Sequence, residues 1–227
     1  MSSRTATSLV LLGCLLLTGG VCQAAALDWE AFAAASGSSQ DPVLMEAMAA
    51  RDLDTDIAIC KGVARRAAPV GGFLEALAAG HHGADAARTE LLLRVLLDVL
   101  VPADMSDSEV ASRLGPNMAS VEALMGRIAE WRDPQLVAVL VRLCRFADPK
   151  VGLPTLMLVG TRIARDLRKE RGQLTPQEVG LGLAFCDAAQ RTGNMDFLQP
   201  CQQIVDLSQD AALVERARTA SKVLAGP

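Results

Sequence analysis

Apolar residues recur every three to four positions along most of the chain, which is the spacing of one buried face on an α-helix. The alternating pattern of a half-buried strand between hairpin turns is absent from the sequence. Three Asp-Pro pairs mark helix starts, since aspartate caps the N-terminus and proline fits the first helical position. They are Asp41-Pro42, Asp133-Pro134 and Asp148-Pro149. The pattern predicts an all-α protein.

Two more helix starts have the residues of a capping box, in which a Ser or Thr and a glutamate three positions later bind each other's backbone N–H. They are SDSE at 106–109 and TPQE at 175–178. Gly152 and Pro154 favour a start as late as Pro154 for the long helix after Asp148. We predict nine to eleven helices, near residues 41–50, 53–67, 70–79, 84–101, 106–113, 118–131, 134–146, 150–170, 176–191, 195–207 and 210–224.

The last two of these helices, DFLQPCQQIVDLSQDAALVERARTASKVL at 196–224, have matched apolar faces. Asp210 lies in the turn between them. The apolar residues are Leu198, Ile204, Val205 and Leu207 in the first helix, and Val214, Ala217, Ala220 and Leu224 in the second. The segment resembles a HEAT-type helical repeat, whose second helix opens with an apolar residue followed by arginine. Here Glu215 follows Val214, and the arginine comes one position later, at Arg216. Because of this departure, the arginine-to-aspartate packing of that family is not carried over to this chain.

A similar pattern centred on Asp133 covers residues 120–146. The resemblance to HEAT and armadillo-type repeats implies antiparallel helical hairpins stacked as a short α-solenoid, in which each hairpin buries its apolar face against the next. An irregular α-helical bundle is the alternative, because short connections suit both. We expect residues 27–227 to form a single domain.

The first 26 residues have the layout of a secretory signal peptide. Arg4 supplies a positive charge, residues 9–17 are apolar, and small residues lead to a cleavage site after Ala24 or Ala26. We therefore expect an exported protein, either periplasmic or secreted. An uncleaved anchor helix over residues 9–26 is an alternative, because that length is just sufficient to span a bilayer.

A second alternative is a lipid anchor at the cell envelope. The sequence LLGC at 11–14 resembles a bacterial lipobox, which would make Cys14 the acylated first residue. Beyond this region the most apolar run, LLLRVLLDVLV at 91–101, is too short to cross a membrane and carries Arg94 and Asp98. No membrane span is therefore expected after cleavage.

Four cysteines remain after residue 26, and an even number in an exported chain favours disulfides over free buried thiols. Cys186 and Cys201 lie at nearly equal distances from the break at 192–194. In antiparallel helices this places them at equal height, about 10 Å from the turn at 1.5 Å per residue. We predict a Cys186–Cys201 disulfide and a Cys60–Cys144 disulfide.

The charge and the aromatic content of the chain disfavour some classes of function. Removal of residues 1–26 takes away Arg4 alone among the charged residues, so the net charge changes from −4 to −5. This disfavours nucleic acid, which requires a cationic surface. Aromatic residues make up 3% of the chain and tyrosine is absent, so stacking platforms for bases or sugars are hard to build. The basic run RIARDLRKER at 162–171 is interpreted as a solvated helix face.

Candidate chemistry is sparse. His81 and His82 are the only histidines, with Asp85 nearby, but neighbouring side chains diverge on a helix or strand and we predict no metal site. The alternation Asp52, Asp54, Asp56 lacks the glycine and closing glutamate of a calcium loop. Phosphate-binding loops and a Gly-x-Ser-x-Gly elbow are also absent.

These observations predict an exported helical-repeat scaffold or protein-interaction module with no cofactor and no catalytic residue, whose partner is another protein. Two other functions stay open. One is a small exported hydrolase that uses carboxylates or His81. The other is a lipid-anchored surface protein acylated at Cys14.

Overall fold

A computed structural model describes residues 53–65, 70–81 and 86–226. Within these ranges the chain is helical and contains no strand, which confirms the all-α prediction. The α-helices are α4 (Leu53–Ala64), α5 (Gly71–Ala79), α6 (Ala86–Leu100), α7 (Asp107–Leu114), α8 (Met118–Gly126), α9 (Pro134–Leu143), α10 (Pro149–Lys169), α11 (Pro176–Thr192), α12 (Leu198–Leu207) and α13 (Ala211–Leu224). The predicted helix at 41–50, the signal peptide and Cys14 lie outside the described residues.

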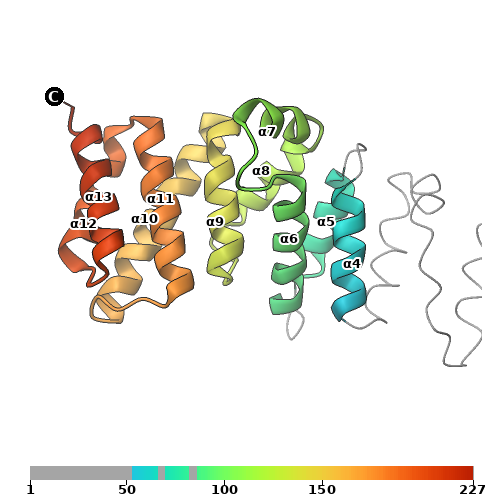
Figure 1. Cartoon of the computed structure of the whole chain (residues 1–227), viewed down its shortest axis with the longest axis horizontal. Helices are drawn as coiled ribbons and strands as arrows, with labels where there is room; N and C mark the ends of the chain where they lie inside the picture. The colour runs from blue at the N-terminus through green and yellow to red at the C-terminus, as the bar shows by residue number, and fades with distance from the viewer. Residues whose placement is uncertain (1–52, 66–69, 82–85, 227) are drawn as a thin grey trace, which may run out of the picture.

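The helices stand side by side along the long axis of the molecule, in two rows (Figure 1). In the first row α4 packs on α6, α6 on α9, α9 on α11 and α11 on α13. In the second row α5 packs on α8, α8 on α10 and α10 on α12. Four sequential pairs join the rows: α5 with α6, α8 with α9, α10 with α11 and α12 with α13. Helix α7 is an additional element between the first two pairs.

Helix starts follow the capping signals of the sequence. The Asp133 carboxylate accepts a hydrogen bond from the N–H of Gln135 at 2.8 Å, and that of Asp148 accepts one from Lys150 at 2.8 Å. At the start of α11, the N–H of Thr175 donates to the Glu178 carboxylate at 2.8 Å. These bonds satisfy N–H groups that have no partner inside the helix. The two Asp-Pro starts and the TPQE start are therefore confirmed, whereas Asp41-Pro42 lies outside the described residues.

Several predicted boundaries differ from the structure. The helix expected at 118–131 ends at Gly126, and that expected at 134–146 gives way to a 3₁₀ turn after Leu143. Helix α10 begins at Pro149, so a start at Pro154 was wrong. The Asp148 cap and the first turn outweigh the single backbone bond that Pro154 removes.

Close packing in the C-terminal part depends on glycine. A Cβ added at Gly160 of α10 would lie 2.7 Å from the Phe185 ring of α11 and 3.1 Å from Pro200 of α12. A Cβ at Gly182 would lie 2.8 Å from a methyl group of Leu213 in α13. Real side chains do not approach so closely, so glycine sets the spacing of these helices. Among the described residues no helix has both the length and the apolar character needed to cross a membrane.

Candidate functional site

His81 was named, alongside carboxylates, for the alternative of a small hydrolase, and the structure places it in a part-buried polar contact. Its Nε2 lies 2.7 Å from Glu90 Oε1, and its ring packs edge-on against Trp131 with centroids 4.6 Å apart. The Glu90 side chain is only 2% exposed. His82 and Asp85 lie outside the described residues. Among the described residues no group of three or more His, Cys, Asp or Glu side chains could hold a metal ion.

Glu90 is already engaged by backbone. Its Oε2 accepts hydrogen bonds from the N–H groups of Arg132, at 2.9 Å, and of Asp133. From the other side, the Arg162 guanidinium of α10 donates to the carbonyls of Trp131, at 2.6 Å, and of Arg132, at 3.1 Å. A buried carboxylate with such partners holds a loop in place. We therefore interpret Glu90 and His81 as parts of a clamp on the α8–α9 loop.

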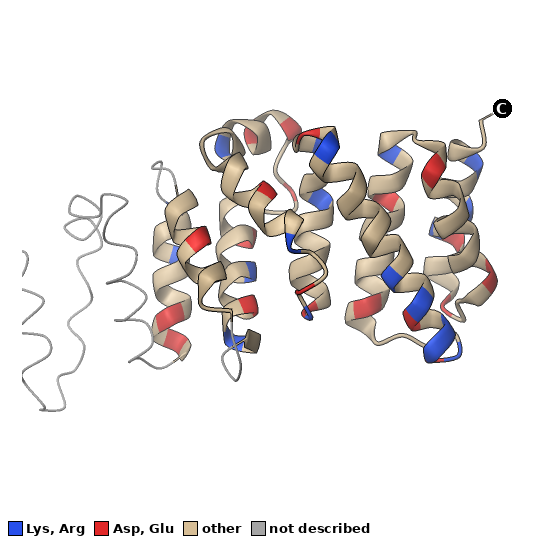
Figure 2. Cartoon of the chain, turned by 180° about the vertical axis from the view of Figure 1, so that it is seen from behind, with Lys and Arg blue, Asp and Glu red and all other residues tan. Residues whose placement is uncertain are grey.

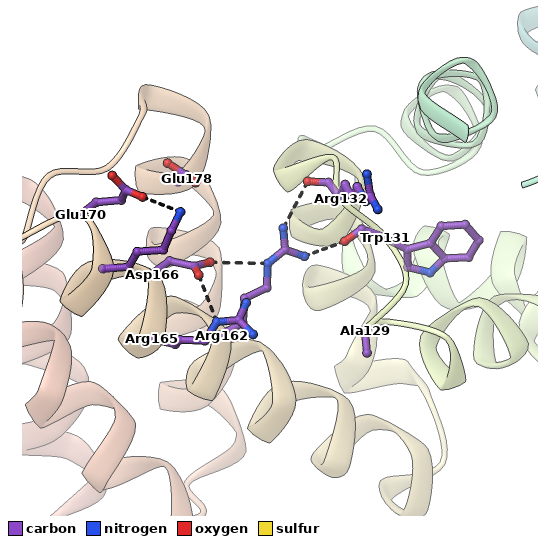
Figure 3. A pocket seen from close by; sticks show the side chains of 9 residues that line it. Ala129, Trp131, Arg132, Arg162, Arg165, Asp166, Glu170 and Glu178 are labelled. Carbon is purple, nitrogen blue, oxygen red and sulfur yellow. Dashed lines mark hydrogen bonds and ion pairs between the residues drawn. The ribbon is translucent and has the colours of Figure 1, made fainter. Parts of the chain in front are cut away.

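A polar cleft of about 310 Å³ lies beside this clamp, between the α8–α9 loop and the C-terminal half of α10 (Figure 3). Its charged groups largely pair with one another: Arg162 with Asp166 at 3.7 Å, Arg165 with Asp166 at 3.2 Å, and Lys169 with Glu170 at 2.8 Å. The basic run at 162–171 supplies most of this lining. Self-paired charges and few apolar atoms leave little to recognise a ligand.

A larger groove of about 450 Å³ lies across the first row, between the α6–α7 segment, α9 and α11. Nine of its fourteen lining residues are apolar, and together they are called its floor: Val101, Pro102, Ala103, Met105, Val110, Leu143, Phe146, Ala184 and Ala188. Three arginines and two aspartates border it: Arg142, Arg145, Arg191, Asp107 and Asp187. An apolar surface with a few charged groups at its edge is the common form of a recognition site.

The arginines of the groove differ in how they are paired. Arg142 lies 3.5 Å from Asp98, and Arg145 lies 2.5 Å from Asp107 while its guanidinium covers the Phe146 ring at 4.6 Å. Burial raises the pKa of Asp98, although Arg142 and Arg94 oppose this shift. Arg191, in the last turn of α11, is exposed and has no hydrogen bond or ion pair to any described residue. It is the groove's available cation.

The sequence predicted each helix that borders the groove but not the groove itself. Its floor combines the segment after Leu100, which ends α6, with faces of α9 and α11 more than thirty residues away. Pro102 stops α6 and turns the chain toward α7. Lysine and arginine are interspersed with acidic residues along the described part of the chain (Figure 2), so no charge run marks this place.

The four described cysteines are all buried, and the structure shows them in the reduced, free-thiol form. Cys186 and Cys201 are hydrogen-bonded to each other, and this bond together with burial raises the pKa of Cys186. Burial raises the pKa of Cys60 and of Cys144, each to about 12. Cys60 lies in α4, at one end of the described stack of helices. Cys144 directly follows α9, which stands near the middle of that stack (Figure 1).

The hairpin that resembles a HEAT repeat forms α12 and α13. Asp210 caps α13 by accepting a hydrogen bond from the N–H of Leu213 at 2.8 Å. Arg216 does not pair with Asp210; it lies 2.9 Å from Asp187 in the neighbouring helix α11. The delayed arginine thus links adjacent helices of the first row.

Comparison with known proteins found no matching family model, no similar curated protein and no similar solved structure.

Proposed function

We propose that the protein is an exported helical-repeat scaffold that binds an acidic, partly apolar peptide segment of a partner protein in the groove between α6, α9 and α11. The observation that carries the proposal is the groove itself, with its apolar floor and its three arginines. The stacked hairpins would act as an α-solenoid, an architecture that presents extended surfaces for binding. No catalytic step is part of the proposal.

Charge complementarity with the groove favours an acidic peptide as the bound segment. The chain as a whole is acidic, yet arginines outnumber aspartates along this groove by three to two. Carboxylates of a partner can bind Arg191 directly, because this guanidinium is exposed and has no ion pair among the described residues. Arg142 and Arg145 are bound to exposed aspartates, and such exposed pairs are weak enough to be exchanged. Apolar side chains of the partner would cover Met105, Phe146 and Ala184.

A peptide selection tests this proposal. Mature protein is panned against a random twelve-residue display library, and selected peptides are labelled and titrated by fluorescence anisotropy. We expect the selected sequences to combine Asp or Glu with Leu, Ile or Phe. Arg191→Glu should weaken their binding about tenfold or more, because it replaces an attraction by a repulsion.

Arg168→Glu is the matched control. Arg168 is also exposed, also lies in the last turn of its helix, and has no ion pair to a described residue, but it is outside the groove. The two variants change net charge equally. Equal weakening by both, or a selection of basic peptides, would contradict the groove as the binding site.

Export is tested separately by intact mass. Protein recovered from the envelope or the medium should begin at Ala25 or Leu27. A mass that retains residues 1–26 would overturn the export part of the proposal, and an acylated chain beginning at Cys14 would replace it with a lipid-anchored form.

A further inference from the structure

Cys186 and Cys201 are brought together by packing around Gly160. A Cβ at that glycine would lie within 3.1 Å of both Phe185 and Pro200, the residues immediately before the two cysteines. Phe185 also packs edge-on against Phe197, with ring centroids 6.2 Å apart. Both cysteine side chains are 0% exposed. Both thiols therefore lie in the buried region where α11 of the first row and α12 of the second each pack on α10, and they are hydrogen-bonded to each other.

The other cysteines of the described ranges have different surroundings. The Cys144 thiol donates to the carbonyl of Leu140 in the preceding turn at 3.4 Å, a contact common for a helical cysteine. Cys60 lies in α4, which packs on α6. Of the described cysteines, only Cys186 and Cys201 have a contact between their side chains. The pairing is thus specific.

We propose that Cys186 and Cys201 form a disulfide that links the two rows of helices and is closed while the chain folds. This inference rests on the proposed export, because exported proteins meet oxidants that cytosolic proteins do not. It is independent of the groove and its partner.

The oxidant is a thiol–disulfide oxidoreductase or a small disulfide. One cysteine thiolate attacks a sulfur of the oxidant's disulfide, forms a mixed disulfide and releases one oxidant sulfur as a thiolate. The second cysteine, after losing its proton, attacks the mixed disulfide and releases the other. One sulfur–sulfur bond of the oxidant is broken, one forms in this chain, and two electrons and two protons pass to the reduced oxidant.

Burial fixes when this exchange takes place. Neither sulfur is accessible once α11 and α12 have packed, so the exchange precedes closure of this part of the core. For the same reason a reductant reaches the bond only when the helices open. The bond closes a loop of about 15 residues, which raises the melting temperature mainly by restricting the unfolded chain.

The test begins with reduced, denatured mature protein refolded in a glutathione redox buffer and mapped without reduction. We expect one linked peptide pair, containing Cys186 and Cys201. Oxidised protein should melt roughly 6–12 °C above the reduced form. Dithiothreitol should cleave the bond slowly in native buffer and rapidly in urea.

Two variants and a second source of protein complete the test. Cys60→Ala with Cys144→Ala should keep the redox-dependent melting shift, whereas Cys186→Ala with Cys201→Ala should lose it. Free Cys186 and Cys201 after redox refolding would overturn the disulfide whatever the compartment. A disulfide on refolding but free thiols in protein from its native compartment would overturn the export on which the proposal rests. Neither result depends on peptide binding.

Discussion

The two halves of the stack are held together by different means. Among the described residues, five of the six buried polar or charged side chains lie before the α8–α9 loop: Asp56, Thr89, Glu90, Asn117 and Ser120. Three of the four close approaches that only glycine permits inside a helix lie after it, at Gly152, Gly160 and Gly182, and the fourth is at Gly71 of α5. The N-terminal half, from Leu53 to Asp133, is joined by directional polar contacts. The C-terminal half, from Pro134 to Gly226, is joined by close apolar packing.

In the N-terminal half two polar contacts connect separate helices. Arg88 of α6 donates from Nε to buried Asp56 of α4 at 2.8 Å. Ser120 of α8 donates to Glu75 of α5 at 2.7 Å. Such contacts define one arrangement, because any other leaves a buried polar group unsatisfied.

In the C-terminal half the helices recognise each other by shape. Gly160 accepts the Phe185 ring and Pro200, and Gly182 accepts Leu213. Apolar packing of this kind tolerates the loss of a polar group but not the addition of volume. The comparison therefore predicts opposite sensitivities for the two halves.

The largest effect is expected from Glu90→Ala. The substitution leaves two backbone N–H groups and His81 without the acceptor that buried Glu90 provides, and should lower the free energy of unfolding by about 3 kcal/mol. Urea denaturation followed by circular dichroism measures this loss. Glu90→Gln should lose less, because its amide oxygen still accepts from the loop.

Glu170→Ala is the control in the C-terminal half. Glu170 pairs with Lys169 at the surface, so its loss should cost less than about 0.5 kcal/mol. If Glu90→Ala proved as mild as this control, the polar clamp would not distinguish the two halves.

Gly160→Ala should give the next largest effect, a loss of about 2 kcal/mol, because the new methyl group would displace the Phe185 ring and Pro200. The matched control is Gly180→Ala in α11, where a Cβ would meet no atom within 4 Å. That variant should gain about 0.5–1 kcal/mol from its higher helix propensity. If urea denaturation showed that both variants change the free energy of unfolding in the same direction, close packing at Gly160 would not explain how the C-terminal half is held together.

The smallest effect concerns a polar contact that is exposed. Hydrogen bonds from the Ser106 hydroxyl and N–H lower the pKa of Glu109 below its ordinary value of 4.5. A carboxyl whose folded pKa is lowered contributes stability above the unfolded pKa, and this contribution disappears as pH falls through the folded pKa. Ser106→Ala should raise the Glu109 pKa toward 4.5, as measured by carbon-detected NMR titration.

Thr175→Ala in the corresponding box of α11 should leave the Glu109 titration unchanged. It should perturb stability about as little as Ser106→Ala, because exposed caps act locally in either half. A much larger loss for one of them would show that position in the stack, rather than burial, determines the value of a polar contact.

The elements were predictable from sequence because their signals are local. Asp133, Asp148 and Thr175 each bind an N–H within three residues, so a short window contains both partners. The proximity of Cys186 and Cys201 could also be predicted from the sequence, because a single turn separates their two helices. Pro154 misled the prediction because the backbone bond that it removes was given more weight than the Asp148 cap.

The clamp and the groove could not be predicted in this way. Glu90 and the N–H of Arg132 are 42 residues apart, and only the packing of α6 on α9 brings them together. Asp56 looked like an ordinary first-turn acid, but burial against α6 made it the partner of Arg88. Which helix faces meet is a property of the whole stack.

The clamp on the α8–α9 loop also has a mechanical side. Two successive peptide units of this loop are each hydrogen-bonded on both sides, namely Trp131–Arg132 and Arg132–Asp133. In each unit Arg162 donates to the carbonyl oxygen and Glu90 accepts from the N–H. In a trans peptide these atoms point in opposite directions, so the two grips pull against each other. A force that separates α6 from α10 is carried through the planes of these two peptides. Where this loop joins α6 of the first row to α10 of the second, tension is thus borne by planar peptide units, which are the stiffest units of the backbone.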